Sequence, residues 1–146
     1  TQPVKECTMT TARDLMSSPA QTLNETDSLV TAAQAFKHGD VGSMPVLAED
    51  GRLVGMVTDR DLVVRGLADG IDPGRGTLSD VLTETVVVLN VDDEVDAIVR
   101  AFSENQVRRV PVLDGQEVVG IISQADIARE LSNERTGQVV EAISRD

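Results

Sequence analysis

One short pattern occurs twice in the chain and places a hydroxyl group and a carboxylate three residues apart. It consists of glycine, two apolar residues, threonine or serine, any two residues and aspartate, and it spans residues 55–61 and 120–126. In each copy the hydroxyl residue is expected where a strand ends and a helix begins. A carboxylate at a helix start can accept two hydrogen bonds from a ribose diol, and the helix N-terminus attracts phosphate. The pattern therefore favours a ligand that contains ribose and phosphate.

The same residues also have a purely structural interpretation. Thr58 with Asp61, and Ser123 with Asp126, fit the capping box, in which two side chains bond the free N–H groups at a helix start. Such a cap contributes about 1 kcal/mol and needs no ligand. The glycine of each copy precedes the strand end and lets another group approach the backbone closely. Both interpretations, ribose ligand and helix cap, stay open at this point.

The residues that catalysis most often requires are scarce. His38 is the only histidine and Cys7 the only cysteine, so the chain lacks the usual His and Cys sets that bind zinc. A Ser-His-Asp arrangement has to use His38, which lies beside a lysine near a predicted helix end and is expected to be exposed. We therefore expect no enzyme activity, no metal and no obligatory cofactor.

The two patterns belong to a longer internal repeat. A shift of 66 residues superimposes the landmarks of the two halves, and a shift of 65 restores the match after a one-residue gap in a turn. The matched pairs include Leu23 with Leu89, Phe36 with Phe102, Pro45 with Pro111, and Asp61 with Asp126. A gap at a turn is where a repeat tolerates a change of length. The chain is therefore predicted to contain two copies of one unit.

Each copy predicts the order strand, helix, strand, strand, helix, which makes an α+β fold of two tandem βαββα repeats. Apolar residues at i, i+3, i+4 and i+7 predict the first helix of each copy, with Asp27 or Ser28, and Asp92 or Asp93, as N-caps. The other expected elements are helical lead-ins over 12–16 and 78–82, an extended stretch over 85–89, and hairpins pairing 44–47 with 53–57 and 110–113 with 118–122.

The domain boundaries follow from the repeat. We predict an N-terminal tail over 1–8, a first repeat over 9–68 and a second repeat over 77–132. The glycine-rich stretch from Gly66 to Gly76 lacks the phosphate-loop pattern, and its part over 69–76 is predicted to be the linker. The remaining segment, 133–146, is predicted to be a tail with a short helix around Val139, Val140 and Ile143.

Composition excludes several classes of partner. The chain carries 13 basic and 25 acidic side chains, for a net charge of −12, and it has two Phe but no Tyr or Trp. A surface this negative repels nucleic acid and anionic lipid, and aromatic platforms for base stacking are few. No apolar run reaches about 18 residues. We expect a cytoplasmic protein with an aliphatic core, without nucleic-acid or membrane binding.

The paired pattern, with Arg-Arg-Val-Pro-Val at 108–112 and Gly-Ile-Ile-Ser-x-x-Asp at 120–126, resembles the CBS-domain (Bateman module) family. The resemblance covers residues 9–131, and its start at 9–16 and the run 53–70 look like stand-alone bacterial CBS pairs of the hypoxic-response type, a stress-response class. It implies a pseudo-twofold module with two clefts between the repeats. Those clefts commonly hold AMP, ADP, ATP or S-adenosylmethionine.

The resemblance also implies a role for individual residues. Ribose contacts map onto Thr58, Asp61, Ser123 and Asp126, and phosphate contacts onto Arg108 and Arg109. Adenine is expected near Thr22 in the first copy and near Val87 in the second, while Arg60 either adds charge to a cleft or is a solvated surface residue. Where the second copy has the two arginines, the first has Gly42 and Ser43. We therefore expect a phosphorylated ligand in the cleft that uses Asp126.

The sequence supports three functions that stay in competition. The first is a regulatory sensor in which an adenosine ligand shifts the packing of the repeats. The second is an adaptor whose clefts stay empty, and the third, disfavoured by the missing acid–base residues, is an enzyme acting on the nucleotide. Apolar residues on the second helices are expected to be exposed and to pair two copies as a homodimer, with a protein partner in trans as a further output. These residues are Leu62, Val63, Leu67, Ile127 and Leu131.

Overall fold

The computed structural model describes residues 10–84 and 87–132, and within them the two repeats have the same order of elements. In both, a short strand is followed by an eleven-residue helix, two longer strands and a second helix, as predicted. The first repeat contains β1 (Leu23–Asn24), α3 (Leu29–Gly39), β2 (Ser43–Leu47), β3 (Leu53–Thr58) and α4 (Asp59–Asp61), which continues as the π-helix η1 (Leu62–Leu67). The second contains β4 (Leu89–Asn90), α5 (Val95–Asn105), β5 (Arg109–Asp114), β6 (Glu117–Ser123) and a helix over residues 124–132.

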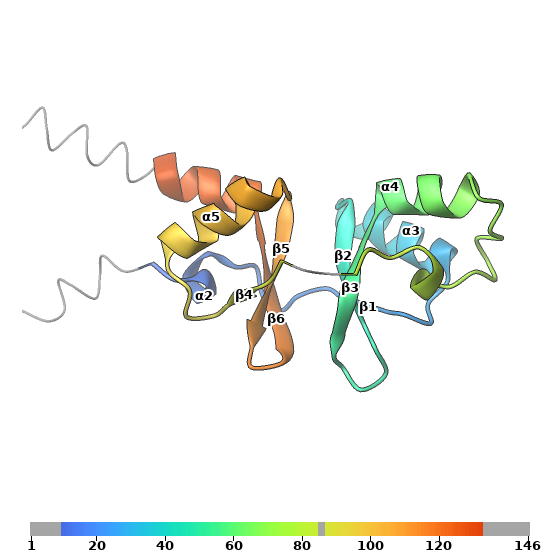
Figure 1. Cartoon of the computed structure of the whole chain (residues 1–146), viewed down its shortest axis with the longest axis horizontal. Coiled ribbons are helices and arrows are strands. Elements are labelled where there is room, and N and C mark those ends of the chain that lie inside the picture. The colour runs from blue at the N-terminus through green and yellow to red at the C-terminus, as the bar shows by residue number, and fades with distance from the viewer. Residues whose placement is uncertain (1–9, 85–86, 133–146) are drawn as a thin grey trace, which may run out of the picture.

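Each repeat builds a three-stranded mixed sheet. β1 is parallel to β2, and β2 is antiparallel to β3; β4, β5 and β6 pair in the same way. The registers are equivalent, because Val46 faces Gly55 in one sheet and Val112 faces Gly120 in the other. The two sheets lie side by side in the middle of the molecule, and the long helices lie outside them (Figure 1). The predicted α+β fold of two βαββα repeats is confirmed.

The lead-in segment of each repeat packs on the other repeat. Figure 1 shows α2 (Ala12–Leu15) beside β4 and α5, and the Ala12 N–H donates to Asp93 O at 2.8 Å. The equivalent segment η2 (Leu78–Asp80) lies on the first repeat, where the Leu78 N–H donates to Asp27 O at 2.9 Å. Because each sheet is completed by a segment that precedes the other repeat in sequence, the sequence repeat and the spatial unit differ.

Glycines make room for this exchange. A Cβ at Gly55 would overlap the Thr83 carbonyl and lie 2.8 Å from Leu82, both in the segment that crosses from the second lead-in. A Cβ at Gly120 would lie 2.7 Å from Cγ of Met16, in the first lead-in. The close approach expected at these glycines is present, but the group that approaches is the protein's own chain and not a ligand.

There is one core per repeat, and each is mainly aliphatic, as the composition predicts, with one phenylalanine, Phe36 or Phe102. Each core includes fully buried residues from the exchanged lead-in, namely Leu78 and Val81 in the first and Ala12 in the second. The remaining buried members of the first core are Leu23, Leu29, Ala32, Phe36, Met44, Val46, Val57 and Leu62, and those of the second are Leu89, Val91, Ile98, Phe102, Val110, Val112, Ile122 and Ile127.

The first helices differ at their N-termini. Ser28 is the N-cap of α3, one of the two predicted candidates, and its Oγ accepts the Thr31 N–H at 3.1 Å. In the second repeat the prediction of Asp92 or Asp93 is wrong, because Glu94 is the N-cap and makes no side-chain cap bond. Asp93 is unavailable for capping because its carboxylate accepts the Asn90 N–H at 2.8 Å in the preceding turn.

The second helices bury more apolar surface than predicted. Leu62 and Ile127 were expected to be exposed, but they face the sheets and belong to the two cores. Leu131 is partly buried against the second core. Val63 and Leu67 are exposed as predicted, and Val64 beside them is exposed too. Within the part of the chain that the structure describes, therefore, the apolar outer helix face belongs to the first repeat.

The segment between the repeats packs back onto the first one. Gly66 belongs to η1, so the glycine-rich stretch begins inside a helix, and Ile71 packs against the first core. The Val30 N–H donates to Pro73 O at 3.0 Å. In the expected extended stretch over 85–89, residues 85 and 86 lie outside the described chain, and the strand itself is limited to β4.

The predicted tail over 1–8 and the predicted C-terminal helix around 139–143 also lie outside the described residues. Within residues 10–84 and 87–132, none of the helices has the length and apolar character needed to cross a bilayer.

Candidate functional site

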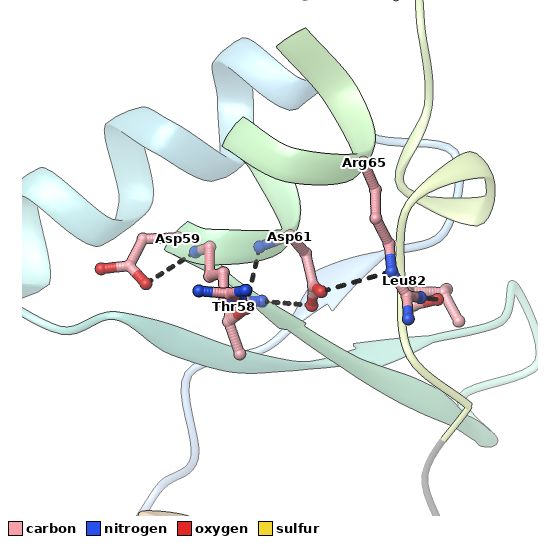
Figure 2. Close-up of polar contacts among 6 residues, drawn as sticks. Thr58, Asp59, Asp61, Arg65 and Leu82 are labelled. Atoms are coloured by element: carbon pink, nitrogen blue, oxygen red, sulfur yellow. Dashed lines mark hydrogen bonds and ion pairs between the residues drawn. The ribbon is translucent and has the colours of Figure 1, made fainter. Parts of the chain in front are cut away.

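The first copy of the repeated pattern forms a complete capping box at the end of β3. The Asp61 N–H donates to Oγ1 of Thr58 at 3.0 Å, and the Thr58 N–H donates to Oδ2 of Asp61 at 3.0 Å (Figure 2). The other carboxylate oxygen of Asp61, Oδ1, lies 3.8 Å from Nε of Arg65, which in turn donates from Nη1 to Leu82 O at 3.3 Å. Asp61 is buried, and its carboxylate is held from both sides.

The second copy repeats this arrangement at the end of β6. The Ser123 N–H donates to Oδ2 of Asp126 at 2.8 Å, and the Asp126 N–H donates to Oγ of Ser123 at 3.3 Å. Arg129 contacts Oδ1 of Asp126, as Arg65 contacts that of Asp61. The capping interpretation therefore holds in both repeats, and each aspartate keeps an arginine on the oxygen that the cap does not use.

A large cavity of about 870 Å³ opens between the repeats next to these helix starts. Binding sites for small ligands measure about 300 to 1,000 Å³. Six of the nine residues singled out in the sequence line it: Thr58, Arg60, Val87, Arg108, Arg109 and Ser123. Both hydroxyl residues thus face one shared cavity. Asp61 and Asp126 are not part of its lining, and neither is Thr22, which is exposed.

The charges in the cavity are unequally distributed. Arg60, Arg108 and Arg109 all line it, and none of the ion pairs formed within the described residues involves any of the three. Because a guanidinium presents several donors in a fixed fork, a group of unpaired arginines around a cavity suits a phosphate or carboxylate. The cavity also holds two acidic side chains, Asp59 and Glu84.

The helix starts present different residues to the cavity. In the first repeat, Oδ1 of Asp59 accepts the Arg60 N–H at 2.7 Å, so a carboxylate already lies at the start of the helix. In the second repeat the equivalent residue is Gln124, whose Nε2 donates to Val107 O at 3.0 Å. Sequence reasoning missed Asp59, Glu84 and Gln124. Asp59 and Gln124 occupy a variable position of the repeated pattern, and comparing the two copies there would have found the difference.

A smaller cavity of about 230 Å³ lies on the other side of Arg109 and Ser43, and these two residues line both cavities. Its walls are mainly apolar and come from β2, from the end of β6 and from the segment that leads to β1. Gln21, the neighbour of the predicted adenine contact Thr22, is among its lining residues. Among the described residues, Arg109 is the only charged one that lines it.

Comparison with known proteins identifies relatives of this chain. The family model described as CBS domain matches it twice, over residues 12–66 and 78–133. The chain is 39% identical over 135 residues to Hypoxic response protein 1 of Mycobacterium tuberculosis, and the match covers 92% of this chain and 94% of that protein.

Solved structures show the same arrangement of repeats. The crystal structure of Hypoxic Response Protein I with two coordinated zinc ions has a TM-score of 0.77 and 39% identity, and the match covers 82% of this chain and 98% of that one. The CBS domain pair of protein MJ0100, in complex with 5-methylthioadenosine and S-adenosyl-L-methionine, has a TM-score of 0.75 and 28% identity, with 86% and 98% covered.

Metal coordination depends on the ligating side chains that the described residues bring together. They contain no group of three or more His, Cys, Asp or Glu side chains placed to hold a metal ion. Zinc sites in proteins usually need three or four such ligands.

Proposed function

The chain belongs to the CBS domain family, and on that premise we propose that it is a regulatory module that binds an adenosine-type ligand in the large cavity between its repeats. The candidates are AMP, ADP, ATP and S-adenosylmethionine. The observation that carries the proposal is the ligand-sized cavity lined by Arg60, Arg108 and Arg109, none of which has an ion-pair partner among the described residues. The related MJ0100 domain pair, solved with S-adenosyl-L-methionine, supports the same ligand class.

We assign a different group of the ligand to each of three sets of lining residues. We assign the phosphate or carboxylate to Arg108 and Arg109, because a guanidinium can bond an oxyanion through two N–H groups at once. The hydroxyls of Thr58 and Ser123 are proposed to contact the ribose, and Val87 the base. Because the carboxylate of Asp59 lies at the first helix start and would repel an anion there, we propose that the phosphate lies toward the second repeat.

We still propose Asp61 and Asp126 as ribose ligands, but each must first change its present contacts. Each already uses Oδ2 for its cap and faces an arginine with Oδ1. Contact with a ribose diol therefore requires the aspartate to exchange its contact with Arg65 or Arg129 for the diol, while the cap bond stays. The proposed ligand touches both repeats and can therefore favour one relative packing of the repeats over another. The equilibrium between two such packings changes only as far as the ligand binds one of them more tightly than the other.

Thermal unfolding with and without added AMP, ATP or S-adenosylmethionine tests this function. A ligand present at about 100 times its Kd stabilises the protein by about 2.7 kcal/mol, which raises Tm measurably. The chain has no Trp and no Tyr, so a co-purified adenine also dominates its ultraviolet spectrum. A clean spectrum together with an unchanged Tm for all three ligands would contradict the proposal.

Substitution of one arginine makes the test specific. Arg108→Gln is expected to weaken the binding of AMP about tenfold or more, because a hydrogen-bonded ion pair with the phosphate is lost. Arg100→Gln is the matched control, since Arg100 is an exposed arginine outside the lining of both cavities. Equal AMP affinity of the two variants would show that Arg108 does not bind the phosphate.

A second candidate function is that of an adaptor that dimerises with its cavities empty. The observation behind it is the cluster of exposed apolar residues on η1, namely Val63, Val64 and Leu67, which are 55%, 46% and 57% exposed. A second copy related by twofold symmetry covers such a face with the same face. We propose this homodimer for either function, and no catalytic step is proposed.

Light scattering distinguishes the two functions. The adaptor predicts a dimer that is independent of nucleotide, whereas the sensor predicts a dimer whose affinity or shape changes when the ligand binds. Leu67→Glu is expected to convert either dimer to monomer, because a buried unpaired charge disfavours the interface. Glu104→Gln, an exposed change on the other repeat, is the control.

A further inference from the structure

Two residues separate the large cavity from the small one. Ser43 and Arg109 belong to the linings of both cavities, and they occupy equivalent positions at the starts of β2 and β5. Ser43 pairs with Thr58 in its sheet, as Arg109 pairs with Ser123. One side of the pseudo-twofold axis therefore offers a hydroxyl, and the other offers a cation.

The small cavity depends on Arg109 for its positive charge. The large cavity has Arg60 and Arg108 in addition, whereas no other charged residue of 10–84 and 87–132 lines the small one. Arg109 is half-buried and has no carboxylate partner among the described residues, so its guanidinium is available to a ligand.

We propose that Arg109 couples the two cavities, so that an anion bound in one weakens the binding of an anion in the other. The inference rests on the proposed nucleotide site and adds its regulation. A guanidinium that turns toward a phosphate in the large cavity leaves the small cavity without a cation, and the two phosphates also repel each other across it. Coupling between sites is reciprocal, so each ligand weakens the other by the same factor. An uncharged nucleoside carries no phosphate to bind Arg109, so its binding in one cavity is not expected to affect binding in the other.

Positive coupling between the two cavities would give a different result. If Arg109 bridged two anions at once, each ligand would strengthen the other. Arg108 separates the alternatives because it lines the large cavity only. Removing the charge of Arg108 lowers the occupancy of the large cavity by AMP at a given AMP concentration and leaves the lining of the small cavity unchanged.

The experiment follows AMP titrations by two-dimensional amide NMR with reporters for each cavity. Val87 and Gln124 report on the large cavity, and Ser17 and Gln21 on the small one. In Arg108→Gln we expect the large-cavity signals to need more AMP. The small-cavity signals are expected to saturate at about five- to tenfold lower AMP than in the wild type, within the usual range of coupling.

Two controls isolate the role of Arg109. In an Arg109→Gln background the additional Arg108→Gln change is expected to leave the small-cavity titration unaltered. With adenosine in place of AMP, Arg108→Gln is expected to leave it unaltered in either background. Both variants remove a half-buried or exposed side chain at the protein surface, and the amide spectra report directly that they are folded.

The outcomes separate this inference from the proposed function. No response of the large-cavity signals to AMP in the wild type would remove the nucleotide site and the coupling with it. A large cavity that responds normally, combined with small-cavity signals that are silent, unchanged or weakened in Arg108→Gln, would overturn the coupling alone. Coupling that persists without Arg109 would overturn its assignment to this residue.

Discussion

The two repeats have the same backbone fold, although most of their side chains differ. Sheet order, strand register and the capping boxes at Thr58 and Ser123 are the same in both. Differences in charge occur in the lining of the large cavity, where Ser43 corresponds to Arg109 and Asp59 to Gln124, and a difference in exposed apolar surface occurs on the outer helix. Buried positions differ as well, since Ala12 corresponds to Leu78 and Met44 to Val110, but these residues are all apolar, whereas the exchanges at the large cavity change the charge. A symmetric scaffold thus presents an asymmetric site.

The repeats also depend on each other for their cores. Ala12 is buried in the core of the second repeat and Leu78 in that of the first, each delivered by the lead-in of the other. Because each repeat supplies part of the other's interior, neither contains a complete core of its own. We therefore expect one cooperative unfolding transition, and any movement of one repeat is transmitted to the other through these segments.

The largest effect is expected from exchanging the two equivalent lead-in residues. Leu78→Ala leaves a cavity in the first core and is expected to lower the free energy of unfolding by about 2–5 kcal/mol. Ala12→Leu places extra atoms in the second core and is expected to cost about 1–3 kcal/mol. Urea unfolding followed by circular dichroism measures both.

Val88→Ala is the control for the leucine change, since Val88 is 44% exposed and lies outside the proposed dimer face, and its truncation is expected to alter stability by about 0.5 kcal/mol at most. Unfolding in two separated steps, with Leu78→Ala affecting only one, would show that the repeats are independent. The conclusion that each repeat needs the other's lead-in to complete its core would then be wrong.

The two crossing glycines provide the next test. Gly55→Ala directs its new methyl group at the Thr83 carbonyl, which is fixed because it accepts the Met56 N–H at 2.9 Å. Gly120→Ala meets the side chain of Met16, whose Cγ and Sδ can rotate aside, so that only its Cβ, 2.9 Å from the new methyl group, requires a small backbone shift. We expect Gly55→Ala to cost about 2 kcal/mol and Gly120→Ala about 1 kcal/mol or less.

Gly74→Ala is the control, because its Cβ comes no closer than 3.6 Å to a neighbouring atom. Thermal and urea unfolding are to be compared for all three variants. Equal losses at Gly55 and Gly120 would mean that Met16 is as rigid as the Thr83 backbone, and the two crossings would have to be regarded as equivalent.

Much of the fold could be predicted because it depends on local patterns. Helical spacing around Leu29 and Val95, hairpin turns at Gly51 and Gly115, and the internal repeat identify the elements and their order. The exchange of lead-ins could not be predicted, because a short apolar helix has the same pattern whichever sheet it covers. For the same reason the sequence did not show that Leu62 and Ile127 face their sheets.

The site was predicted in part. Thr58, Ser123, Arg108 and Arg109 follow from the repeated pattern and the resemblance, and they line one cavity. That both hydroxyls face the same cavity depends on how two sheets are placed, which no local pattern encodes. The ribose role of Asp61 and Asp126 stays a prediction, since capping accounts for their present contacts.

The smallest effect is expected at the N-caps of the first helices. Ser28 caps α3 through its side chain, whereas Glu94, its counterpart in the second repeat, caps α5 only by position. Their backbones are nearly the same, with φ and ψ of −78° and 163° at Ser28 and −90° and 169° at Glu94. A serine at position 94 can therefore bond the helix as Ser28 does. We expect Ser28→Ala to lower the free energy of unfolding by about 1 kcal/mol and Glu94→Ser to raise it by up to about 1 kcal/mol.

The charge of Glu94 complicates this last comparison, because a carboxylate near a helix N-terminus is itself favourable by about 0.3–1 kcal/mol. Glu94→Ala removes the charge without adding a cap, so the difference between Glu94→Ser and Glu94→Ala isolates the cap bond. Urea unfolding at high salt, where the interaction of the charge with the helix is screened, increases the contrast. If the serine variant is no more stable than the alanine variant there, the side-chain cap is not what distinguishes the two helix starts, and the turn formed by Asn90 and Asp93 has to be examined instead.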